Sequence, residues 1–207
     1  MKILDCAQGT PEWFAARCGI ATASGFSDIL ATIKSGEAAA RRNYRARLVV
    51  ERLTGKTVET FKTAAMRQGT EREPAARATY EAQTGAWVNE VGFCRHDDLE
   101  AGASPDGLIG EDGGLEIKCP ELATHLGYLR MDGIPSEYVA QVQGCLWITG
   151  RDWWDFASYS PDFPERLQLV VRRVHRDEQY IGRLAVAVEA FMAEVHEEED
   201  ALRRMAA

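Results

Sequence analysis

The sequence predicts an α/β (α+β) fold, with a central mixed β-sheet flanked by helices, and three features support this class. The first 84 residues show helical periodicity, a hairpin of two short strands follows near residues 108–118, and the C-terminal part reads helix, strand, strand and helix. The 207 residues, with 45% hydrophobic and 27% charged side chains, suit a soluble protein with a sizeable core. No repeat, low-complexity linker or domain boundary is evident, so we predict a single domain over residues 1–207.

Two short helices are predicted near the N-terminus. Thr10 followed by Pro11 is a typical helix start, and this first helix carries Arg17. A second helix is predicted to begin near Ser24. A hydroxyl at a helix N-terminus and an arginine on the preceding helix would form an anion pocket. The alternative, that Ser24 only caps its helix, is equally compatible with the local sequence.

Two longer helices are predicted over residues 37–53 and 63–84, and a glycine follows each of them. The first carries four arginines, which are more typical of a solvated helix face than of a nucleic-acid contact: Arg41, Arg42, Arg45 and Arg47. The second contains Pro74, which should kink the helix or mark a restart. Glu73 lies immediately before this proline, and only tertiary folding could bring its carboxylate to a site elsewhere in the chain.

The remaining elements alternate between strand and helix. Runs rich in β-branched or aromatic residues predict strands over residues 87–93, 153–159 and 167–174. Apolar residues at helical spacing predict helices over residues 121–130 and 136–149, and a long terminal helix that Asp177 caps.

The most informative stretch is the hairpin, where residues 103–120 read A-S-P-D-G-L-I-G-E-D-G-G-L-E-I-K-C-P. The glycine-rich residues 110–114 predict its turn. Alternate residues of a strand share a face, so Glu116 and Lys118 point one way while their apolar neighbours point into the opposite layer. Asp106, just before the first strand, can meet that pair across the hairpin.

Two carboxylates and an ammonium at one point are typical of a site that binds a divalent cation. Crowded, partly desolvated carboxylates repel each other unless a cation lies among them. Mg²⁺ and Mn²⁺ take oxygen ligands, keep positions for water and phosphate, and lower the pKa of bound water. The alternative is a surface hairpin with a solvated ion pair, because E-x-K alone occurs by chance. A P-D pair ten residues before E-x-K, on strand-like apolar residues, is more specific and favours a nuclease.

Charge and cysteine content narrow the function classes only partly. The net charge of −8 is uneven, because residues 1–80 hold 13 Lys and Arg against 8 Asp and Glu, and residues 81–207 hold 11 against 24. The basic part can therefore still contact phosphates. The five cysteines are scattered without a C-x-x-C pair, so we expect no disulfide, zinc or iron–sulfur site. No secretion signal or long apolar run is present, so we expect a cytoplasmic protein without membrane attachment.

Six motifs follow one another over nearly the whole chain. They are W-x-x-x-R-x-G-x-x-T-A-S at 13–24, G-x-x-x-E at 69–73 with A-R at 76–77, S-P-D-G-L at 104–108, L-E-I-K-C-P at 115–120, Y-V-A-Q-V-Q at 138–143 with a tryptophan at 147, and R-D-E-Q-Y at 176–180. Together they resemble the phage lambda exonuclease / YqaJ-type viral recombinase family, within the PD-(D/E)xK nuclease superfamily. This resemblance implies a restriction-endonuclease-like core, forming a single nuclease domain.

The resemblance also implies an activity. It is that of an ATP-independent, Mg²⁺-dependent exonuclease that degrades one strand of double-stranded DNA in the 5′-to-3′ direction. Such an enzyme releases 5′-mononucleotides and leaves a 3′ single strand for phage-type recombination by single-strand annealing. The implied cofactor is Mg²⁺ or Mn²⁺, with two ions per active site.

The resemblance places five side chains in the catalytic site: Asp106, Glu116, Lys118, Glu73 and Gln141. The metal ligands would be Asp106, Glu116, Glu73 and the carbonyl of Ile117. Lys118 would activate or position the attacking water, and Gln141 would support that water or the scissile phosphate. Because Pro74 directly follows Glu73, the orientation of this carboxylate is the least determined of the four acidic and basic positions.

A second group of residues would contact DNA: Arg17, Ser24, Ser104, Trp13, Lys34 and Met66. Arg17 and Ser24 would hold the 5′-phosphate, in agreement with the anion pocket suggested above. Ser104 would add a phosphate contact, and Trp13 would lie beside the pocket, with core packing as its alternative role. Lys34 matches a basic position that tracks the duplex groove, although its ammonium replaces the expected guanidinium. Met66 matches an apolar wedge that splits the terminal base pairs.

Partners and rival functions follow from the same resemblance. It implies a ring-shaped homotrimer that threads double-stranded DNA ends, in a bacterial host cell with a phage or prophage, together with a RecT- or Bet-like single-strand annealing protein. The rivals are another PD-(D/E)xK nuclease, either RecB-like, Cas4-like or a site-specific endonuclease, and a non-catalytic DNA-end-binding module. The cysteine content disfavours an iron–sulfur nuclease, and intact Asp106, Glu116 and Lys118 disfavour a module without catalysis.

Overall fold

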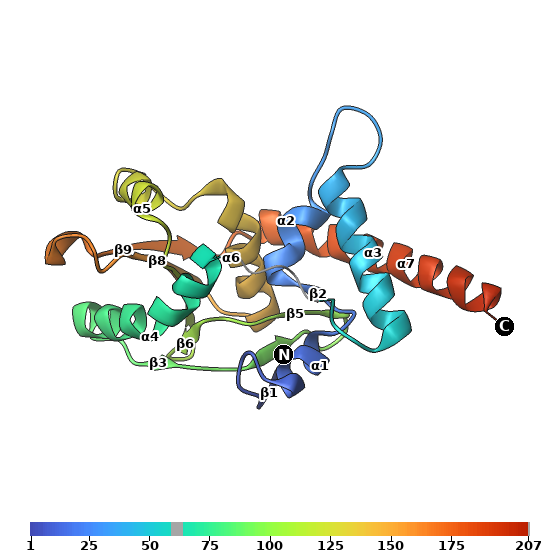
Figure 1. Cartoon of the computed structure of the whole chain (residues 1–207), viewed down its shortest axis with the longest axis horizontal. Coiled ribbons are helices and arrows are strands. Elements are labelled where there is room, and N and C mark those ends of the chain that lie inside the picture. Colours follow the sequence, from blue (N-terminus) through green and yellow to red (C-terminus); the bar gives the residue numbers. More distant parts are fainter. Residues whose placement is uncertain (59–63, 207) are drawn as a thin grey trace.

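The structure is a computed structural model that describes residues 1–58 and 64–206 (Figure 1). Its strands are β1 (Lys2–Leu4), β2 (Ala21–Thr22), β3 (Val88–Asn89), β4 (Phe93–Arg95), β5 (Ala101–Ala103), β6 (Gly107–Ile109), β7 (Gly113–Lys118), β8 (Trp153–Tyr159) and β9 (Leu169–His175). Its helices are α1 (Pro11–Arg17), α2 (Phe26–Ile29), α3 (Ala39–Thr54), α4 (Ala64–Thr84), α5 (Leu122–Leu129), α6 (Ser136–Thr149) and α7 (Glu178–Met205), with short 3₁₀ turns η1 (Ala23–Gly25) and η2 (Glu165–Leu167).

The larger sheet has five strands in the order β3-β6-β7-β8-β9. Strands β7 and β8 run parallel, with Leu115 opposite Asp155, and the other neighbours are antiparallel, so the sheet is mixed as the sequence predicted. The parallel pair needs a crossover, and α5 and α6 supply it. The predicted hairpin is the pair β6 and β7. The α/β fold class is therefore confirmed.

The two faces of β7 meet different layers, which positions the acidic residues. Leu115 and Ile117 pack against Ala76 and Tyr80 of α4 in one buried cluster. The opposite face of the sheet is covered by α5 and α6, where Phe156 of β8 contacts aromatic rings from both helices. The alternation predicted for this strand thus directs its polar side chains toward α6.

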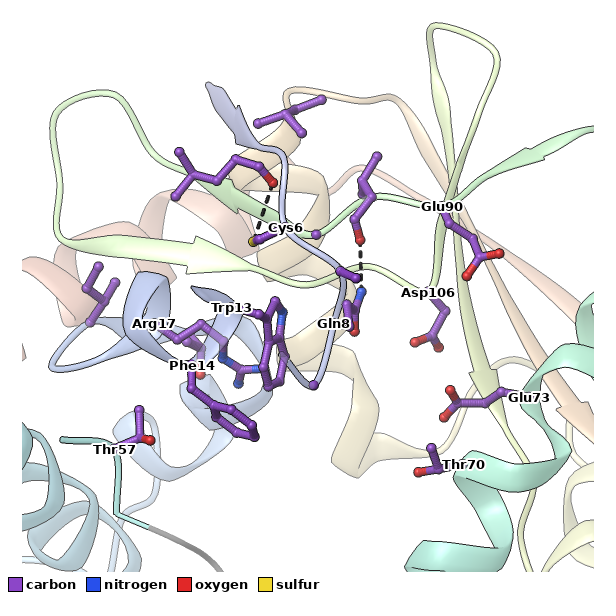
Figure 2. Close-up of a pocket in the computed structure, with 18 of the residues that line it drawn as sticks. Cys6, Gln8, Trp13, Phe14, Arg17, Thr57, Thr70, Glu73, Glu90 and Asp106 are labelled. Atoms are coloured by element: carbon purple, nitrogen blue, oxygen red, sulfur yellow. Dashed lines mark hydrogen bonds between the residues drawn. The ribbon is translucent and has the colours of Figure 1, made fainter. Parts of the chain in front are cut away.

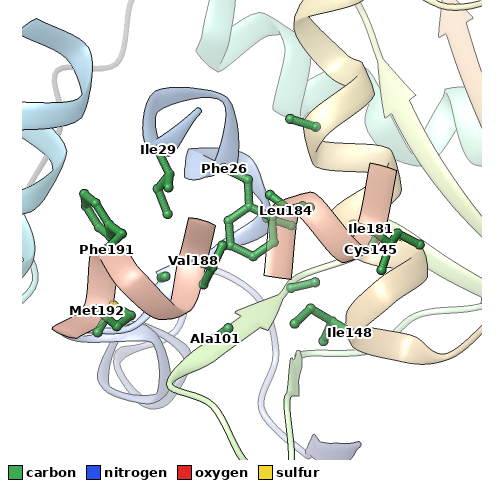
Figure 3. Close-up of a cluster of buried hydrophobic side chains, with 14 of the residues drawn as sticks. Phe26, Ile29, Ala101, Cys145, Ile148, Ile181, Leu184, Val188, Phe191 and Met192 are labelled. Atoms are coloured by element: carbon green, nitrogen blue, oxygen red, sulfur yellow. The ribbon is translucent and has the colours of Figure 1, made fainter. Parts of the chain in front are cut away.

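The main core lies where α2, α3, α6 and α7 meet, and Figure 3 shows part of it. Phe26, Leu184, Val188 and Phe191 are at most 1% exposed. Gly144 of α6 allows this packing, because a Cβ atom there would lie 2.4 Å from the Phe26 ring. The stripe predicted for the terminal helix is this core, and Asp177 caps the helix by accepting hydrogen bonds from two backbone N–H groups.

The single strand predicted over residues 87–93 is wrong. The chain forms β3 and β4 instead, which belong to different sheets. Between them, Gly92 passes so close to the end of β1 that a Cβ atom would lie 2.0 Å from the Cys6 carbonyl oxygen. The smaller sheet, of order β1-β4-β5-β2, was not predicted, since strands of two or three residues carry too little alternation to be recognised.

Most helices agree with the prediction, with small differences at their ends. Helix α6 has the predicted bounds and ends at Gly150, whose φ is 69°. Helix α3 begins at Ala39, and Glu37 stands before it and binds Arg41 and Arg45. Helix α4 continues through Pro74, so a restart there is wrong, and Figure 1 shows its two halves running in different directions. None of the helices within the described ranges is both long and apolar enough to cross a bilayer.

Candidate active site

A cleft of about 1420 Å³ opens between α1, α3, α4 and the loops that precede β4 and β6. Figure 2 shows its two sides. Trp13 and Arg17 of α1 project into it from one side, and Glu73 of α4 and Asp106 face it from the other. A cationic group and an acidic group, far apart in the sequence, thus face the same cavity.

The acidic side is tied together by hydrogen bonds. The backbone N–H of Ile117 donates to Asp106 Oδ2 at 2.6 Å, which joins the loop before β6 to β7. Glu116 Oε1 accepts from Lys118 Nζ at 2.5 Å and from Gln141 Nε2 at 2.6 Å. Because α6 carries Gln141 and packs over this face of the sheet, the structure brings these side chains to one point.

Burial and charge together set the protonation behaviour of this cluster. Burial raises the pKa of the Asp106 carboxyl well above its usual value, and the neighbouring Glu116 charge raises it further. Burial alone would lower the pKa of Lys118, but the charges of Glu116 and Asp106 outweigh that effect and raise it. Lys118 therefore stays a charged ammonium among carboxylates. Asp106 lies next to other negatively charged groups, which disfavour its ionised form.

The donor set fits a divalent cation. Glu116 Oε2 is buried and has no hydrogen-bond partner among the described residues, which leaves a carboxylate oxygen uncompensated. Hard cations such as Mg²⁺ and Mn²⁺ prefer oxygen ligands of this kind. Within the described ranges, however, no three His, Cys, Asp or Glu side chains form a complete ligand group. A bound ion would therefore also need ligands such as the Ile117 carbonyl, water or phosphate oxygens.

Glu73 is half-buried on α4, next to the proline that the helix passes through. Its charge contributes to the raised pKa of Asp106, although less than burial and Glu116 do. Figure 2 shows the two carboxylates facing the same space. The structure thus brings Glu73 to the acidic cluster, which the sequence alone could not decide.

The cationic side is built on Trp13. The Arg17 guanidinium stacks on the Trp13 ring, 4.0 Å from its centre, and Trp13 Nε1 donates to Ser104 Oγ at 3.0 Å. Burial lowers the pKa of Arg17. Ser24, in the 3₁₀ turn η1, is exposed, and its hydroxyl lies 3.3 Å from that of Thr22 in the cleft wall. Two of the predicted phosphate contacts, Arg17 and Ser104, therefore lie against one tryptophan, and Ser24 lies beside Thr22 of the cleft wall.

One predicted DNA contact, Lys34, is not brought to this cleft. Lys34 is exposed on the loop between α2 and α3, which projects from the molecule in Figure 1, and it is not part of the cleft wall. The side chain of Met66 lies outside the described residues. Conversely, Tyr44 and Arg47 line the cleft and were not predicted as site residues. Their spacing of three residues on one helix face was the available signal.

Comparison with known proteins identifies the family. The model of the YqaJ-like viral recombinase domain matches residues 12–152, which span both sides of the cleft. The chain belongs to this family.

Solved structures similar to this YqaJ-family chain include the alkaline exonuclease LHK-Exo from Laribacter hongkongensis, with 43% sequence identity and a TM-score of 0.87. A structure of LHK-Exo in complex with dAMP has the same identity and a TM-score of 0.89. Each comparison covers 95% of this chain and 98% of the other. A phage-related exonuclease from Haemophilus somnus 129PT shares the fold at 14% identity, with a TM-score of 0.68. That comparison covers 91% of this chain and 96% of the other. The uncharacterized protein ExoD of Escherichia coli (strain K12) is 37% identical over 67 residues, or 32% of this chain and 75% of ExoD.

Proposed function

We propose that this YqaJ-family protein is an exonuclease that hydrolyses one strand of double-stranded DNA from its 5′ end and releases 5′-mononucleotides. The observation that carries the proposal is the partly buried cluster of Asp106, Glu116 and Lys118, whose Asp106 faces a cleft that Arg17 enters from the other side. One relative at 43% identity, the alkaline exonuclease LHK-Exo, is known from two solved structures, and one of these contains dAMP, a nucleoside monophosphate of the kind such hydrolysis releases.

The reaction is proposed to depend on Mg²⁺ or Mn²⁺ and not on ATP, with two ions in each active site. Asp106, Glu116, Glu73 and the Ile117 carbonyl would hold them, and the uncompensated Glu116 Oε2 supports this assignment. When bound, the ions supply Lewis-acid activation of the phosphodiester and of the attacking water.

The chain's own residues have separate tasks. The Lys118 ammonium orients the attacking water and offsets the negative charge that develops on the scissile phosphate. It is suited to this because the surrounding carboxylates raise its pKa and keep it charged. Gln141 donates to Glu116 Oε1, so its amide fixes the carboxylate and remains close to the reacting groups. Glu73 adds a carboxylate from α4.

The cationic side is proposed to hold the terminal 5′-phosphate. Arg17 supplies a guanidinium, Ser24 and Ser104 supply hydroxyls, and Trp13 keeps the arginine and Ser104 in place. A strand end held there would direct its first phosphodiester toward the acidic side of the same cleft. Lys34 is proposed to follow the duplex outside the cleft, and Met66 to separate the terminal base pairs.

At the level of the assembly, we propose a ring-shaped homotrimer that encloses duplex DNA and acts with a RecT- or Bet-like annealing protein in phage-type recombination. A ring would turn the basic surface of each subunit toward the DNA and its acidic surface outward. This arrangement would let a chain of net charge −8 bind DNA.

Digestion of a linear duplex, labelled separately at each 5′ and 3′ end, tests the activity. With Mg²⁺ and without ATP, we expect 5′ labels to appear first as mononucleotides while 3′ labels remain on long single strands. Without divalent ions, no product should form. Early release of 3′ labels would contradict the direction, cleavage of closed circular duplex would indicate an endonuclease, and binding without any cleavage would indicate an end-binding module.

A further inference from the structure

A second arginine, which the proposed function does not use, lines the same cleft as Arg17. Arg47 lies on α3, and its guanidinium stacks on the Tyr44 ring, 4.6 Å from the ring centre. Arg17 is held in the same way by Trp13 of α1. Arg67 and Arg77 of α4 also line the cleft. Arg77 pairs with Glu90, whereas Arg17 and Arg47 are each stacked on an aromatic ring of their own helix.

The platform beneath Arg47 is rigid and connected to the predicted phosphate pocket. Tyr44 is 3% exposed, its ring stacks on Phe191 of α7, and its hydroxyl accepts a hydrogen bond from the Thr22 backbone N–H at 2.8 Å. The Thr22 hydroxyl in turn lies 3.3 Å from that of Ser24. Gly25 leaves room for the Tyr44 ring beside this turn, because a Cβ atom at residue 25 would lie 2.5 Å from the ring.

Neither guanidinium forms an ion pair with a carboxylate in the described part of the chain. Two carboxylates are near enough to act electrostatically. Glu51 of α3 raises the pKa of Arg17, but its oxygens accept from the backbone N–H groups of Gly19 and Val58. Asp28 of α2 forms no ion pair with Arg47; burial raises the pKa of Asp28, and the charge of Arg47 partly opposes this. Among the arginines of the wall, Arg17 and Arg47 are thus positive charges that no described carboxylate binds directly.

The two guanidinium groups also act on each other. Burial lowers the pKa of Arg17, Tyr44 and Glu51 oppose this, and the charge of Arg47 lowers it further. Like charges held near each other in a partly buried wall are unfavourable unless an anion joins them. A phosphate monoester carries close to two negative charges at neutral pH, whereas an internal phosphodiester carries one, so the monoester matches the charge of this pair.

We propose that Arg47 is a specificity-determining residue of the terminal-phosphate pocket, and that Arg17 and Arg47 together select a dianionic phosphate monoester over a monoanionic phosphodiester. The inference rests on the proposed function and extends it to a residue on a different helix. Arg17 supplies binding to any phosphate at this position. Arg47 supplies the additional preference for a strand end that carries a free phosphate group.

The test is binding of one duplex with three kinds of 5′ end: hydroxyl, methyl phosphate diester and phosphate. The duplex carries a fluorescent label at a distant position, and anisotropy is measured in EDTA at about pH 7.5, above the second phosphate pKa of about 6. We expect wild-type protein to bind the phosphate end more tightly than the methyl phosphate end, and the methyl phosphate end more tightly than the hydroxyl end. Because no cleavage occurs, the result does not depend on catalysis.

The variant Arg47→Ala should weaken binding of the phosphate end about tenfold, the loss typical of one charged hydrogen bond, while binding of the other two ends changes little. Arg47→Lys should retain part of the preference, since the point charge remains. The matched control is Arg42→Ala, which removes an exposed guanidinium from the same helix outside the cleft wall. Unchanged thermal unfolding of Arg47→Ala verifies its fold.

The outcomes separate the two proposals. If wild-type protein prefers the phosphate end and Arg47→Ala keeps the full preference, the role of Arg47 is refuted while the pocket at Arg17 stands. Equal weakening for all three ends would make Arg47 a general backbone contact and would also refute it. If wild-type protein binds all three ends equally, the terminal-phosphate pocket itself is wrong, whereas the exonuclease activity is judged by the labelled duplex alone.

Discussion

Glu116 is 2% exposed, and its two carboxylate oxygens have different surroundings. Oε1 accepts from Lys118 and Gln141, while Oε2 is buried without a partner among the described residues. An ionised carboxylate in such a place is costly unless a cation compensates it. At the residue scale, the site therefore contains an uncompensated carboxylate oxygen, which a divalent cation is suited to bind.

The role of Lys118 can be tested by Lys118→Ala. We expect cleavage of duplex DNA to fall by about 10²–10³-fold or more, because the group that stabilises the developing charge is lost. Binding of the same duplex in EDTA should persist, since the half-buried Lys118 is paired with Glu116 and does not form the cationic side. Initial rates and anisotropy measure the two effects, with exposed Lys2→Ala as the control. Cleavage at the wild-type rate would remove Lys118 from the mechanism.

Metal binding predicts a stability change that does not require activity. Mg²⁺ at about 100 times its dissociation constant should stabilise the wild-type protein by about 2.7 kcal/mol, which raises its thermal midpoint relative to EDTA. Glu116→Gln should lose most of this shift, because a neutral amide is a poor ligand for a hard cation. Glu111→Gln, in the exposed hairpin turn, is the control and should keep it. A Glu116→Gln protein with the full shift would contradict the ligand assignment.

At the element scale, α4 connects the acidic cluster to the sheet. Tyr80 of this helix donates to Asp155 Oδ2 at 2.7 Å, and Asp155 also receives a bidentate contact from Arg173, at 2.9 Å for both bonds. This network, buried at Tyr80 and Asp155 and exposed at Arg173, fixes α4 against β8 and β9. Because Glu73 lies on the same helix, two turns before Tyr80, the network also fixes where that carboxylate can reach.

Helices α3 and α7 are joined by ion pairs, so the arginines of α3 are only partly a solvated face. Arg41 contacts Glu194 with two bonds of 2.8 Å, and Arg52 contacts Glu199 at 2.5 Å. Hydrogen bonding to Arg41 lowers the pKa of Glu194, and hydrogen bonding to Arg52 lowers that of Glu199. A carboxyl with a lowered pKa binds fewer protons when folded than when unfolded, so it stabilises the fold increasingly as the pH rises.

The predicted pH dependence follows from that sign. Glu194→Gln should lower the free energy of unfolding at pH 7 by at most about 1 kcal/mol, since the pair is partly exposed. The difference from wild type should shrink as the pH falls below 4.5, the ordinary pKa of this carboxyl, because wild-type Glu194 then becomes protonated too. Urea unfolding at several pH values measures this. Glu189→Gln, exposed on the same helix, should give no such difference, and a gap that widens in acid would contradict the assignment.

At the scale of the whole molecule, the charge distribution is partly neutralised within the fold. The acidic run near the C-terminus supplies Glu194, Glu198 and Glu199 to the arginines of α3. Arg17 and Arg47 remain available in the cleft. A net charge of −8 is thus compatible with DNA binding, because these acidic groups form ion pairs away from the cleft.

The proposed assembly gives a prediction for the intact protein. Light scattering after gel filtration should give about three times the 23.0 kDa mass of one chain. Affinity for duplex DNA should fall steeply with added salt, since phosphate contacts release bound counterions. A stable monomer with full activity would contradict the ring, and a flat salt dependence would contradict an enclosed duplex.

The sequence by itself determined the features that neighbouring residues control. Alternation along β7 directed Glu116 and Lys118 to one face, glycines ended α3 and α6, and Asp177 capped α7, because strand pleating, helix periodicity and end capping act within a few residues. It also carried the motifs by which the family is recognised. The site roles assigned from that resemblance remain predictions.

Only the tertiary structure decided which distant elements meet. The split of residues 88–95 between two sheets, the contact of Gln141 with Glu116, and the entry of Arg47 into the cleft of Arg17 all join segments far apart in the chain. Such contacts depend on how whole faces of helices and sheets pack, and a periodic pattern specifies that a face is buried without specifying its partner. That is the physical reason why Arg47 read as a solvated arginine in the sequence and lies in the cleft wall of the folded protein.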